Sequence, residues 1–303
     1  MIYFADENDI GKRLDVLLTE VLPDVSRSKI QSNIKSGFIK VNANLQKSSY
    51  IVKEDDNIVV DDVISKPVKI IPQNINLQIV YEDENMLVVN KPSGMLTHPT
   101  ANEMENTLVN ALLYKYGDNL SNINGEFRRG IVHRLDRNTS GLLMIAKNNK
   151  THSLLAEEIK SHRVEKKYRA IVKGIWERDE ELVDLPIGRN KKQPNKMTVV
   201  SDGKQSQTYV KVIRRFKEIT ALELTLITGR THQIRVHMSY MGHPVYNDTL
   251  YGSGKGKIKT NEQVLQSFSI RFTKPFSDEI ISLEIEPDEE YKKVYNYFED
   301  REK

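Results

Sequence analysis

The chain begins with two short stretches whose apolar residues recur at intervals of three and four. Between residues 10 and 22, four leucines and a valine fall on one side of a helix. Pro23 ends this helix, and Ser26 is a suitable N-cap for a second helix that Gly37 would end. The sequence therefore predicts two short amphipathic helices, each with one apolar side turned inward.

The alternation then changes to the two-residue period of β-strands. Residues 38–42 and 51–62 each alternate in this way, with a turn between them. Residues 66–80 contain two prolines and no clear period, which is typical of an extended linker. We therefore expect a small α/β module over residues 1–65, followed by this linker.

The remainder of the chain, residues 81–303, alternates between strand-like and helix-like stretches. The expected strands are two around a turn at residues 83–85, followed by residues 142–146, 165–176, 222–227, 267–272 and 280–287. The expected helices are one beginning at Thr107, residues 151–161, residues 231–241 with Thr231 as N-cap, and the segment after Pro287. The pattern predicts an α+β fold, with a small module followed by a larger mixed-sheet domain.

Composition narrows the class of protein. A chain of 303 residues with 38% hydrophobic content can bury substantial cores. It has no cysteine, which excludes disulfides, cysteine-based zinc sites and a thiol nucleophile. The N-terminal residues lack the apolar core of a signal peptide, and no run approaches the roughly 18 apolar residues of a membrane span. We therefore expect a cytoplasmic protein without a membrane partner.

The net charge of +3, from 45 basic and 42 acidic residues, is too small to indicate a nucleic-acid partner by itself. Its distribution is more informative, because residues 25–53 contain no Asp or Glu. The basic residues of this segment are Arg27, Lys29, Lys35, Lys40, Lys47 and Lys53. Arg27, Lys29, Lys35 and Lys40 are the candidates for binding RNA phosphates. The alternative is an ordinary lysine-rich surface exposed to solvent.

The densest group of chemically reactive side chains lies in residues 131–147. His133, Arg134, Asp136 and Arg137 fall within five positions, ahead of several turn-forming residues and a short apolar stretch typical of a buried strand. A carboxylate on a loop beside two arginines can be held ionised, as a nucleophile or a general base requires. The same arrangement also fits a structural turn closed by ion pairs.

Four stretches of the chain resemble a known family. Residues 133–143, HRLDRNTSGLL, are similar to the signature loop of the RluA family of RNA pseudouridine synthases. The family's other motifs resemble, in the same order, YEDENMLVVNKPSGMLTHP (81–99), KKYRA (166–170) and GRTHQIRVHMSYMGHPVYND (229–248). Residues 10–60 resemble the small alpha-L type RNA-binding module often fused ahead of this catalytic domain. The resemblance implies a mainly antiparallel sheet of the pseudouridine synthase type.

The resemblance also implies an activity. Such an enzyme isomerises selected uridines in RNA by breaking the N-glycosidic bond, turning the base and rejoining it through carbon, and no cofactor is implied. The target base must first leave its stack, which costs a few kcal/mol that contacts with the RNA must offset. We expect the RNA to be ribosomal, namely the 23S RNA of the large subunit, and the protein to be a monomer.

The roles of individual residues follow from the same resemblance. Asp136 is the implied catalytic carboxylate, either as a nucleophile or as a base, and Arg134 would fill the space that the extruded base leaves. Tyr168 would lie against the target base, since base stacking on an aromatic ring contributes roughly 1–3 kcal/mol. A tyrosine in a strand is, however, also typical of plain packing. Arg235 would pair with Asp136 and help keep it charged, and Arg230 is the alternative.

Two other classes of function remain to be weighed. The first is a non-catalytic RNA-binding or ribosome-assembly protein of the same fold, against which an intact Asp136, Tyr168 and Arg235 count. The second is a hydrolase of glycosidic bonds, which would require a second acidic residue in a recognisable motif. The sequence offers no such motif.

The histidines do not form a recognisable metal site. His232 and His237 lie five residues apart, whereas the zinc-binding pair of a helix lies four apart on one side. No nearby carboxylate completes a ligand set. We therefore expect no metal.

Overall fold

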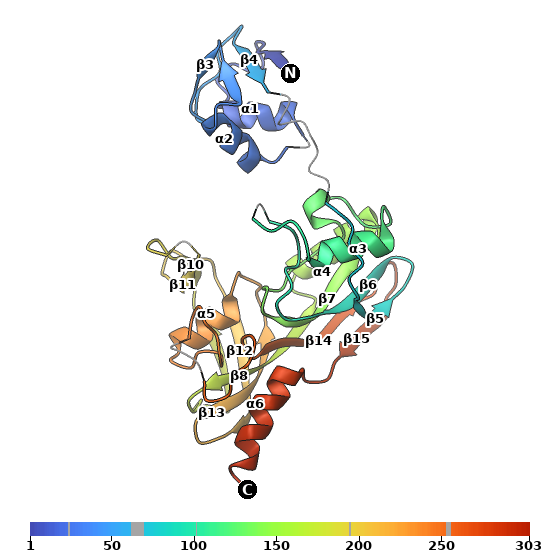
Figure 1. Ribbon diagram of the computed structural model, residues 1–303, viewed down its shortest axis with the longest axis vertical. Coiled ribbons are helices and arrows are strands. Elements are labelled where there is room, and N and C mark those ends of the chain that lie inside the picture. The colour runs from blue at the N-terminus through green and yellow to red at the C-terminus, as the bar shows by residue number, and fades with distance from the viewer. Residues whose placement is uncertain (24, 62–69, 101, 194, 253–255) are drawn as a thin grey trace. The chain divides into compact units, whose positions relative to one another are not determined.

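The chain divides into two units, Met1–Lys69 and Ile70–Lys303, and each has its own hydrophobic packing: one core in the first unit and cores on both faces of the sheet in the second. The computed structural model describes residues 1–23, 25–61, 70–100, 102–193, 195–252 and 256–303 (Figure 1). None of the helices in these ranges has the length and apolarity needed to span a lipid bilayer.

The first unit packs two helices, α1 (Leu14–Val21) and α2 (Arg27–Lys35), on a small antiparallel sheet. The strands, in sheet order, are β1 (Ile2–Phe4), β4 (Asn57–Val60), β2 (Ile39–Val41) and β3 (Asn44–Leu45). The predicted apolar sides of both helices are buried, and the side chain of Ser26 accepts a hydrogen bond from the Lys29 amide, which confirms it as the N-cap of α2.

The second unit begins earlier than the predicted linker allows. Positions 66–69 of the expected linker, residues 66–80, lie outside the described residues. From Ile70 onward the chain packs on the second unit, because the Ile70 side chain is buried in its core. Asn110 fixes the next residues: its side-chain amide donates to the Ile71 carbonyl, and its own carbonyl accepts from the Gln73 amide. The residues from Ile70 onward show no periodic pattern because they pack as an irregular segment on the second unit, and the sequence therefore did not distinguish them from a linker.

One mixed sheet of nine strands forms the centre of the second unit. Its strands, in sheet order, are β5 (Gln78–Glu82), β6 (Met86–Lys91), β7 (Ser140–Ala146), β14 (Leu265–Thr273), β8 (Glu165–Lys173), β13 (Ile219–Leu226), β12 (Gln207–Arg215) and β9 (Glu180–Asp184), with β15 (Ile280–Glu284) paired to β14. Among the described strands only β7 and β14 run parallel. The predicted mixed, mainly antiparallel sheet is therefore confirmed.

Helices cover both faces of this sheet (Figure 1). One face is covered by α3 (Leu108–Tyr116) and α5 (Gln233–Tyr240), and the other by α4 (Asn149–Lys160) and α6 (Glu289–Asp300). A short 3-10 helix, η2 (Glu126–Arg128), precedes the signature loop, and a separate hairpin consists of β10 (Ile187–Arg189) and β11 (Met197–Val199). The four predicted helices are all present.

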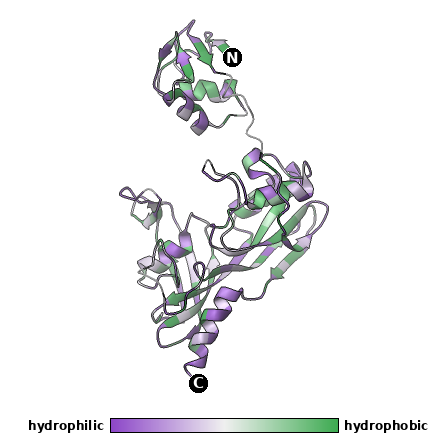
Figure 2. Ribbon diagram, viewed as in Figure 1, coloured by the Kyte–Doolittle hydropathy of each residue, from purple (hydrophilic) through white to green (hydrophobic). Residues whose placement is uncertain are grey.

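The strand β7 follows the signature loop directly and is buried along its whole length. Leu143 and Ile145 belong to the core on one face of the sheet, and Leu142 and Met144 to the core on the other. This explains the uninterrupted apolar run, since a strand covered on both faces has no polar side (Figure 2). A Cβ on Gly141 would lie 2.1 Å from the Ser267 carbonyl oxygen, so the close approach to β14 requires glycine.

Candidate active site

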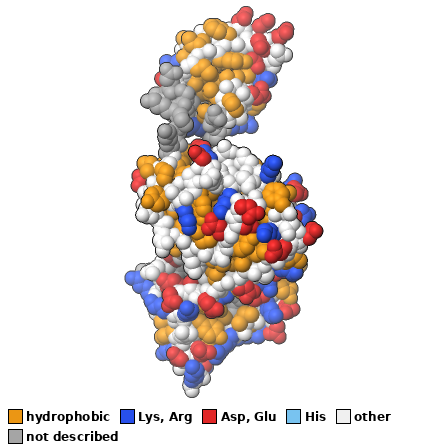
Figure 3. Space-filling model, turned by 90° about the vertical axis from the view of Figure 1, so that its right-hand side faces the viewer, with side chains coloured by type: hydrophobic (Ala, Val, Ile, Leu, Met, Phe, Trp, Pro, Cys, Tyr) orange, Lys and Arg blue, Asp and Glu red, His pale blue; other side chains and the backbone are white. Residues whose placement is uncertain are grey.

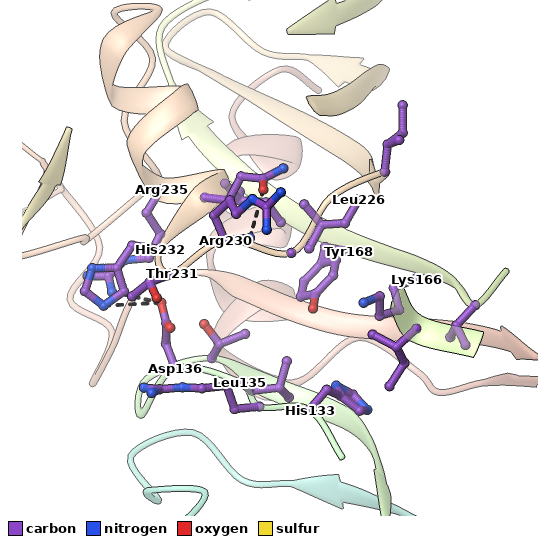
Figure 4. A pocket seen from close by; sticks show the side chains of 18 of the residues that line it. His133, Leu135, Asp136, Lys166, Tyr168, Leu226, Arg230, Thr231, His232 and Arg235 are labelled. Atoms are coloured by element: carbon purple, nitrogen blue, oxygen red, sulfur yellow. Dashed lines mark hydrogen bonds and ion pairs between the residues drawn. The ribbon is translucent and has the colours of Figure 1, made fainter. Parts of the chain in front are cut away.

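A cavity of about 540 Å³ lies where the signature loop, the start of β8 and the connection from β13 to α5 meet. Its walls include Arg134, Asp136, Tyr168 and Arg235, the four residues singled out from the sequence of this domain. Figure 4 shows the last three of them around the cavity. The fold therefore brings together residues from three motifs that are up to about 100 positions apart. The volume is in the usual range for a small-molecule site, about 300–1,000 Å³.

Arg235 joins two carboxylates. Its Nη1 donates to Oδ2 of Asp136 at 3.1 Å, and its Nε and Nη2 donate to the two oxygens of Asp248 at 2.7 and 2.9 Å. The Asp136 side chain is 18% exposed, whereas that of Asp248 is fully buried. Asp248 therefore fixes the guanidinium, which in turn holds Asp136 at the cavity wall. The second oxygen of Asp136 accepts no hydrogen bond from the residues that the structure describes.

Asp248 was not singled out from the sequence, although it is the last residue of the third motif. Burial opposes ionisation of its carboxyl, but the hydrogen bonds and charge of Arg235 outweigh this effect and hold the pKa of Asp248 below its usual value. The Leu250 and Tyr251 amides also donate to it. A carboxylate with this many donors is a structural anchor and not an open acid.

Three side chains from the end of β6 and the loop after it hold the backbone of the signature loop. Lys91 is completely buried, and its ammonium donates to the carbonyls of Pro92, Met95 and Arg137. The hydroxyls of Ser93 and Thr97 donate to the carbonyls of Asn138 and Leu135 at 2.9 and 3.0 Å. These contacts fix the path of the chain on both sides of Asp136. The first motif thus has a positioning role that its sequence alone did not reveal.

His232 lies beside the catalytic candidate and corrects the predicted helix start. Its backbone is left-handed, with φ of 57°, and α5 begins at the next residue, so Thr231 is not the N-cap. Its Nδ1 is hydrogen-bonded to the Tyr251 hydroxyl at 2.8 Å, and its Nε2 lies 3.9 Å from Asp136 Oδ2. Burial is the main cause that lowers the pKa of His232, which keeps the ring neutral near pH 7.

The structure supports the packing interpretation of Tyr168, and its contact with a base stays a prediction. Tyr168 belongs to the hydrophobic core and also lines the cavity, where its ring extends from β8 opposite Asp136 (Figure 4). Burial raises the pKa of its hydroxyl, so the phenol stays protonated. Packing fixes the ring at the wall of the cavity.

His133 is a structural residue of the signature loop. Its Nε2 accepts a hydrogen bond from the Met144 amide at 3.0 Å, and burial lowers the pKa of the ring to about 3. A neutral imidazole is required for this contact, because a protonated ring would offer no acceptor. The interaction ties the loop to β7.

The described wall of the cavity contains a single carboxylate. Asp136 is the only acidic residue among the described residues that line it. A glycosidase-type pair of carboxyl groups is therefore not present in this wall. Across the described ranges, no cluster of three or more metal-ligating side chains occurs either.

The four basic candidates of the first unit are all exposed. Arg27 donates to the buried carboxylate of Asp15 at 3.0 Å, so part of its guanidinium is engaged within the unit. Lys29, Lys35 and Lys40 have no carboxylate within 4 Å in the described part of the chain. On the face of the molecule in Figure 3, by contrast, acidic and basic side chains are interspersed over the second unit.

Comparison with known proteins agrees with this geometry. Residues 85–240 match the RNA pseudouridylate synthase family, and residues 12–58 match the S4 domain. An uncharacterised RNA pseudouridine synthase of Bacillus subtilis is 41% identical, covering 92% of each chain. The ribosomal large subunit pseudouridine synthase D of Zymomonas mobilis is 42% identical, covering 88% of this chain and 84% of its own.

A solved structure supports the same assignment. The human RNA pseudouridylate synthase domain containing 1 superposes with a TM-score of 0.58 at 29% identity, covering 71% of this chain and 84% of its own. The resemblance of the four motifs is thus confirmed over most of the sequence. The chain belongs to the RluA family of RNA pseudouridine synthases, enzymes that isomerise uridine to pseudouridine in RNA.

Proposed function

We propose that Asp136 is the catalytic carboxylate of this isomerisation. The reaction breaks the bond between N1 of uracil and C1′ of the ribose, turns the base, and joins C5 to C1′. A proton leaves C5 and N1 gains one, so the product has the same formula as the substrate. A nucleophile attacking the nucleotide and a base removing a sugar proton both require an ionised carboxylate with a free oxygen. The observation that carries the proposal is the contact of Arg235 with one oxygen of Asp136, since the other oxygen accepts no hydrogen bond from any described residue.

The proposal assigns the remaining wall residues to the flipped nucleotide. Tyr168 stacks against the uracil, and Arg235 keeps Asp136 charged and oriented. Arg134, exposed on the same loop, fills the gap that the base leaves in the RNA. Support comes from the shared cavity and from the order of these residues along it, with Asp136 and Tyr168 on opposite walls (Figure 4).

We further propose that the substrate is large-subunit ribosomal RNA and that the enzyme acts as a cytoplasmic monomer. The relatives named for the ribosomal large subunit support the choice of RNA. Pseudouridine mapping in total RNA from a strain that lacks the gene, and from the same strain with the gene restored, tests it. The proposal expects at least one 23S position to lose its modification and regain it. If every 23S position stays modified, the substrate is another RNA.

The first unit is proposed to bind RNA phosphates through Arg27, Lys29, Lys35 and Lys40. The triple variant Lys29→Gln, Lys35→Gln, Lys40→Gln should lower the affinity for structured RNA. It should also reduce the slope of log K against log salt by about 0.7–0.9 for each phosphate that is no longer neutralised by a lysine. Binding of one folded RNA at several salt concentrations measures both effects.

The matched control removes three exposed lysines from the second unit, through Lys150→Gln, Lys211→Gln and Lys217→Gln. Both triple variants change the net charge equally, so only position distinguishes them. Equal slopes for the two would mean that the lysines of the first unit are merely solvated.

A further inference from the structure

Two lysines of the site, Lys91 and Lys166, differ in how their ammonium groups are satisfied: Lys91 is fully buried and Lys166 is half-buried. Lys91 donates to three carbonyls. Lys166 lines the cavity and has neither a hydrogen bond nor a carboxylate within 4 Å among the described residues. Burial lowers the pKa of Lys166, and no neighbouring acid opposes this effect. The half-buried ammonium faces the cavity and is therefore available to a partner from outside the chain, and partial burial strengthens its attraction to an anion.

The strand directs Lys166 toward that partner. Lys166 and Tyr168 are two positions apart on β8 and therefore lie on the same face. In Figure 4 the ammonium points into the cavity beside the tyrosine. The backbone of Gly229 lies beside the ammonium, and even a Cβ there would come no closer than 3.8 Å to the Lys166 nitrogen, so Gly229 does not crowd it.

The charges of the cavity indicate what kind of group fits there. Arg235 already balances Asp136, the single acid of the described wall. The remaining charged residues that line the cavity are Arg134, Lys160, Lys166 and Arg230. His133, next to Lys166, is neutral. The surplus of positive charge favours an anion over a neutral carbonyl.

We propose that Lys166 binds a phosphodiester of the RNA backbone next to the target uridine. The inference rests on the proposed function only in that the RNA strand must enter this cavity. Tyr168 then holds the base and Lys166 holds the adjoining phosphate, so that one face of strand β8 binds both parts of the substrate. Lys166 is a binding residue in this arrangement and takes no part in proton transfer.

The test compares Lys166→Met with Lys166→Arg, both in the full chain carrying Asp136→Asn so that the RNA is not consumed. The probe is a short single-stranded oligouridylate. Lys166→Met should weaken binding about tenfold, as expected when a charge-assisted hydrogen bond is removed, and should lower the salt slope by about 0.7–0.9. Lys166→Arg should keep the slope. The control Lys211→Met, an exposed lysine outside the cavity, should change neither quantity.

A probe with an uncharged methylphosphonate at a single linkage identifies the phosphate directly. At one linkage it should weaken binding to the parent protein as much as Lys166→Met does, with no further loss when both changes are combined. Additive losses at every linkage would overturn the proposal, and so would an unchanged salt slope. Either of these two outcomes would be expected if Lys166 contacted the uracil instead of a phosphate.

Stability of the free protein supplies an independent criterion. Because the Lys166 ammonium has no partner among the described residues, Lys166→Met should raise the midpoint of thermal unfolding by about 2–4 °C. A lower midpoint would show that the lysine is structural and would overturn the proposal. These readouts do not depend on turnover, so they can fail while the parent enzyme still forms pseudouridine, and they can succeed even if Asp136 is not the catalytic residue.

Discussion

Asp136→Asn should abolish pseudouridine formation while leaving the fold and RNA binding intact. The amide preserves the shape of the side chain but cannot act as a nucleophile or as a base. Turnover should fall at least about a hundredfold, the lower limit of what a positioned acid or base contributes. Single-turnover kinetics on ribosomal RNA, together with RNA affinity and the unfolding midpoint of the same preparation, measure the three quantities.

Arg137→Gln is a matched control for this variant. Arg137 is on the same loop, but its guanidinium pairs with Glu103 outside the cavity. It should retain most of its activity, because the path of the loop depends on the carbonyl of Arg137 and not on its side chain. Turnover of Asp136→Asn within tenfold of the parent enzyme would reject Asp136 as the catalytic carboxylate.

Arg235→Ala should be the most damaging single change to stability in the site. It leaves the fully buried carboxylate of Asp248 without its bidentate partner. Breaking a buried pair in this way typically costs about 3–5 kcal/mol of unfolding free energy. Activity should fall as well, because Asp136 loses its only side-chain donor among the described residues. Denaturant unfolding of the full chain gives the free energy.

A double-mutant cycle separates the two partners of Arg235. Combining Arg235→Ala with Asp248→Asn should recover much of the stability, since the uncompensated charge is removed with its partner. Combining it with Asp136→Asn should recover less, because Asp136 is partly exposed to solvent. The control Arg178→Ala, which breaks an exposed pair with Glu181, should cost no more than about 1 kcal/mol. Simple additivity of Arg235→Ala and Asp248→Asn would contradict the pairing.

Sequence patterns predicted those parts of the fold in which neighbouring residues alone determine the local structure. The apolar run of β7 and the N-cap at Ser26 are of this kind, because burial on both faces and a hydroxyl at a helix start leave direct traces in the sequence. The start of α5 was missed for the opposite reason. His232 adopts a left-handed backbone, which cannot be predicted from a histidine in the sequence. Its hydrogen bond to Tyr251 joins residues 19 positions apart, so no local pattern indicates it.

The site was predictable where one motif carries the chemistry and not where motifs meet. The grouping of charged residues around Asp136 was visible in the chain, and its pairing with Arg235 followed from the family resemblance. The anchoring of Arg235 by Asp248, and of the signature loop by Lys91, depends on contacts between distant segments. No spacing rule in a single sequence reveals such contacts. The ammonium of Lys166 is a further case. Its lack of a hydrogen bond or carboxylate partner among the described residues can be seen only in the folded chain.

The most direct test of the central claim follows the hydrogen at C5 of the target uridine. Joining C5 to C1′ removes that hydrogen, so an RNA labelled with tritium at C5 of uridine releases its label into water when pseudouridine forms. The account predicts that the parent enzyme releases tritium from 23S ribosomal RNA in proportion to the number of sites modified, and that Asp136→Asn releases none while binding the same RNA equally well. Release by Asp136→Asn at a rate close to that of the parent enzyme would contradict the account.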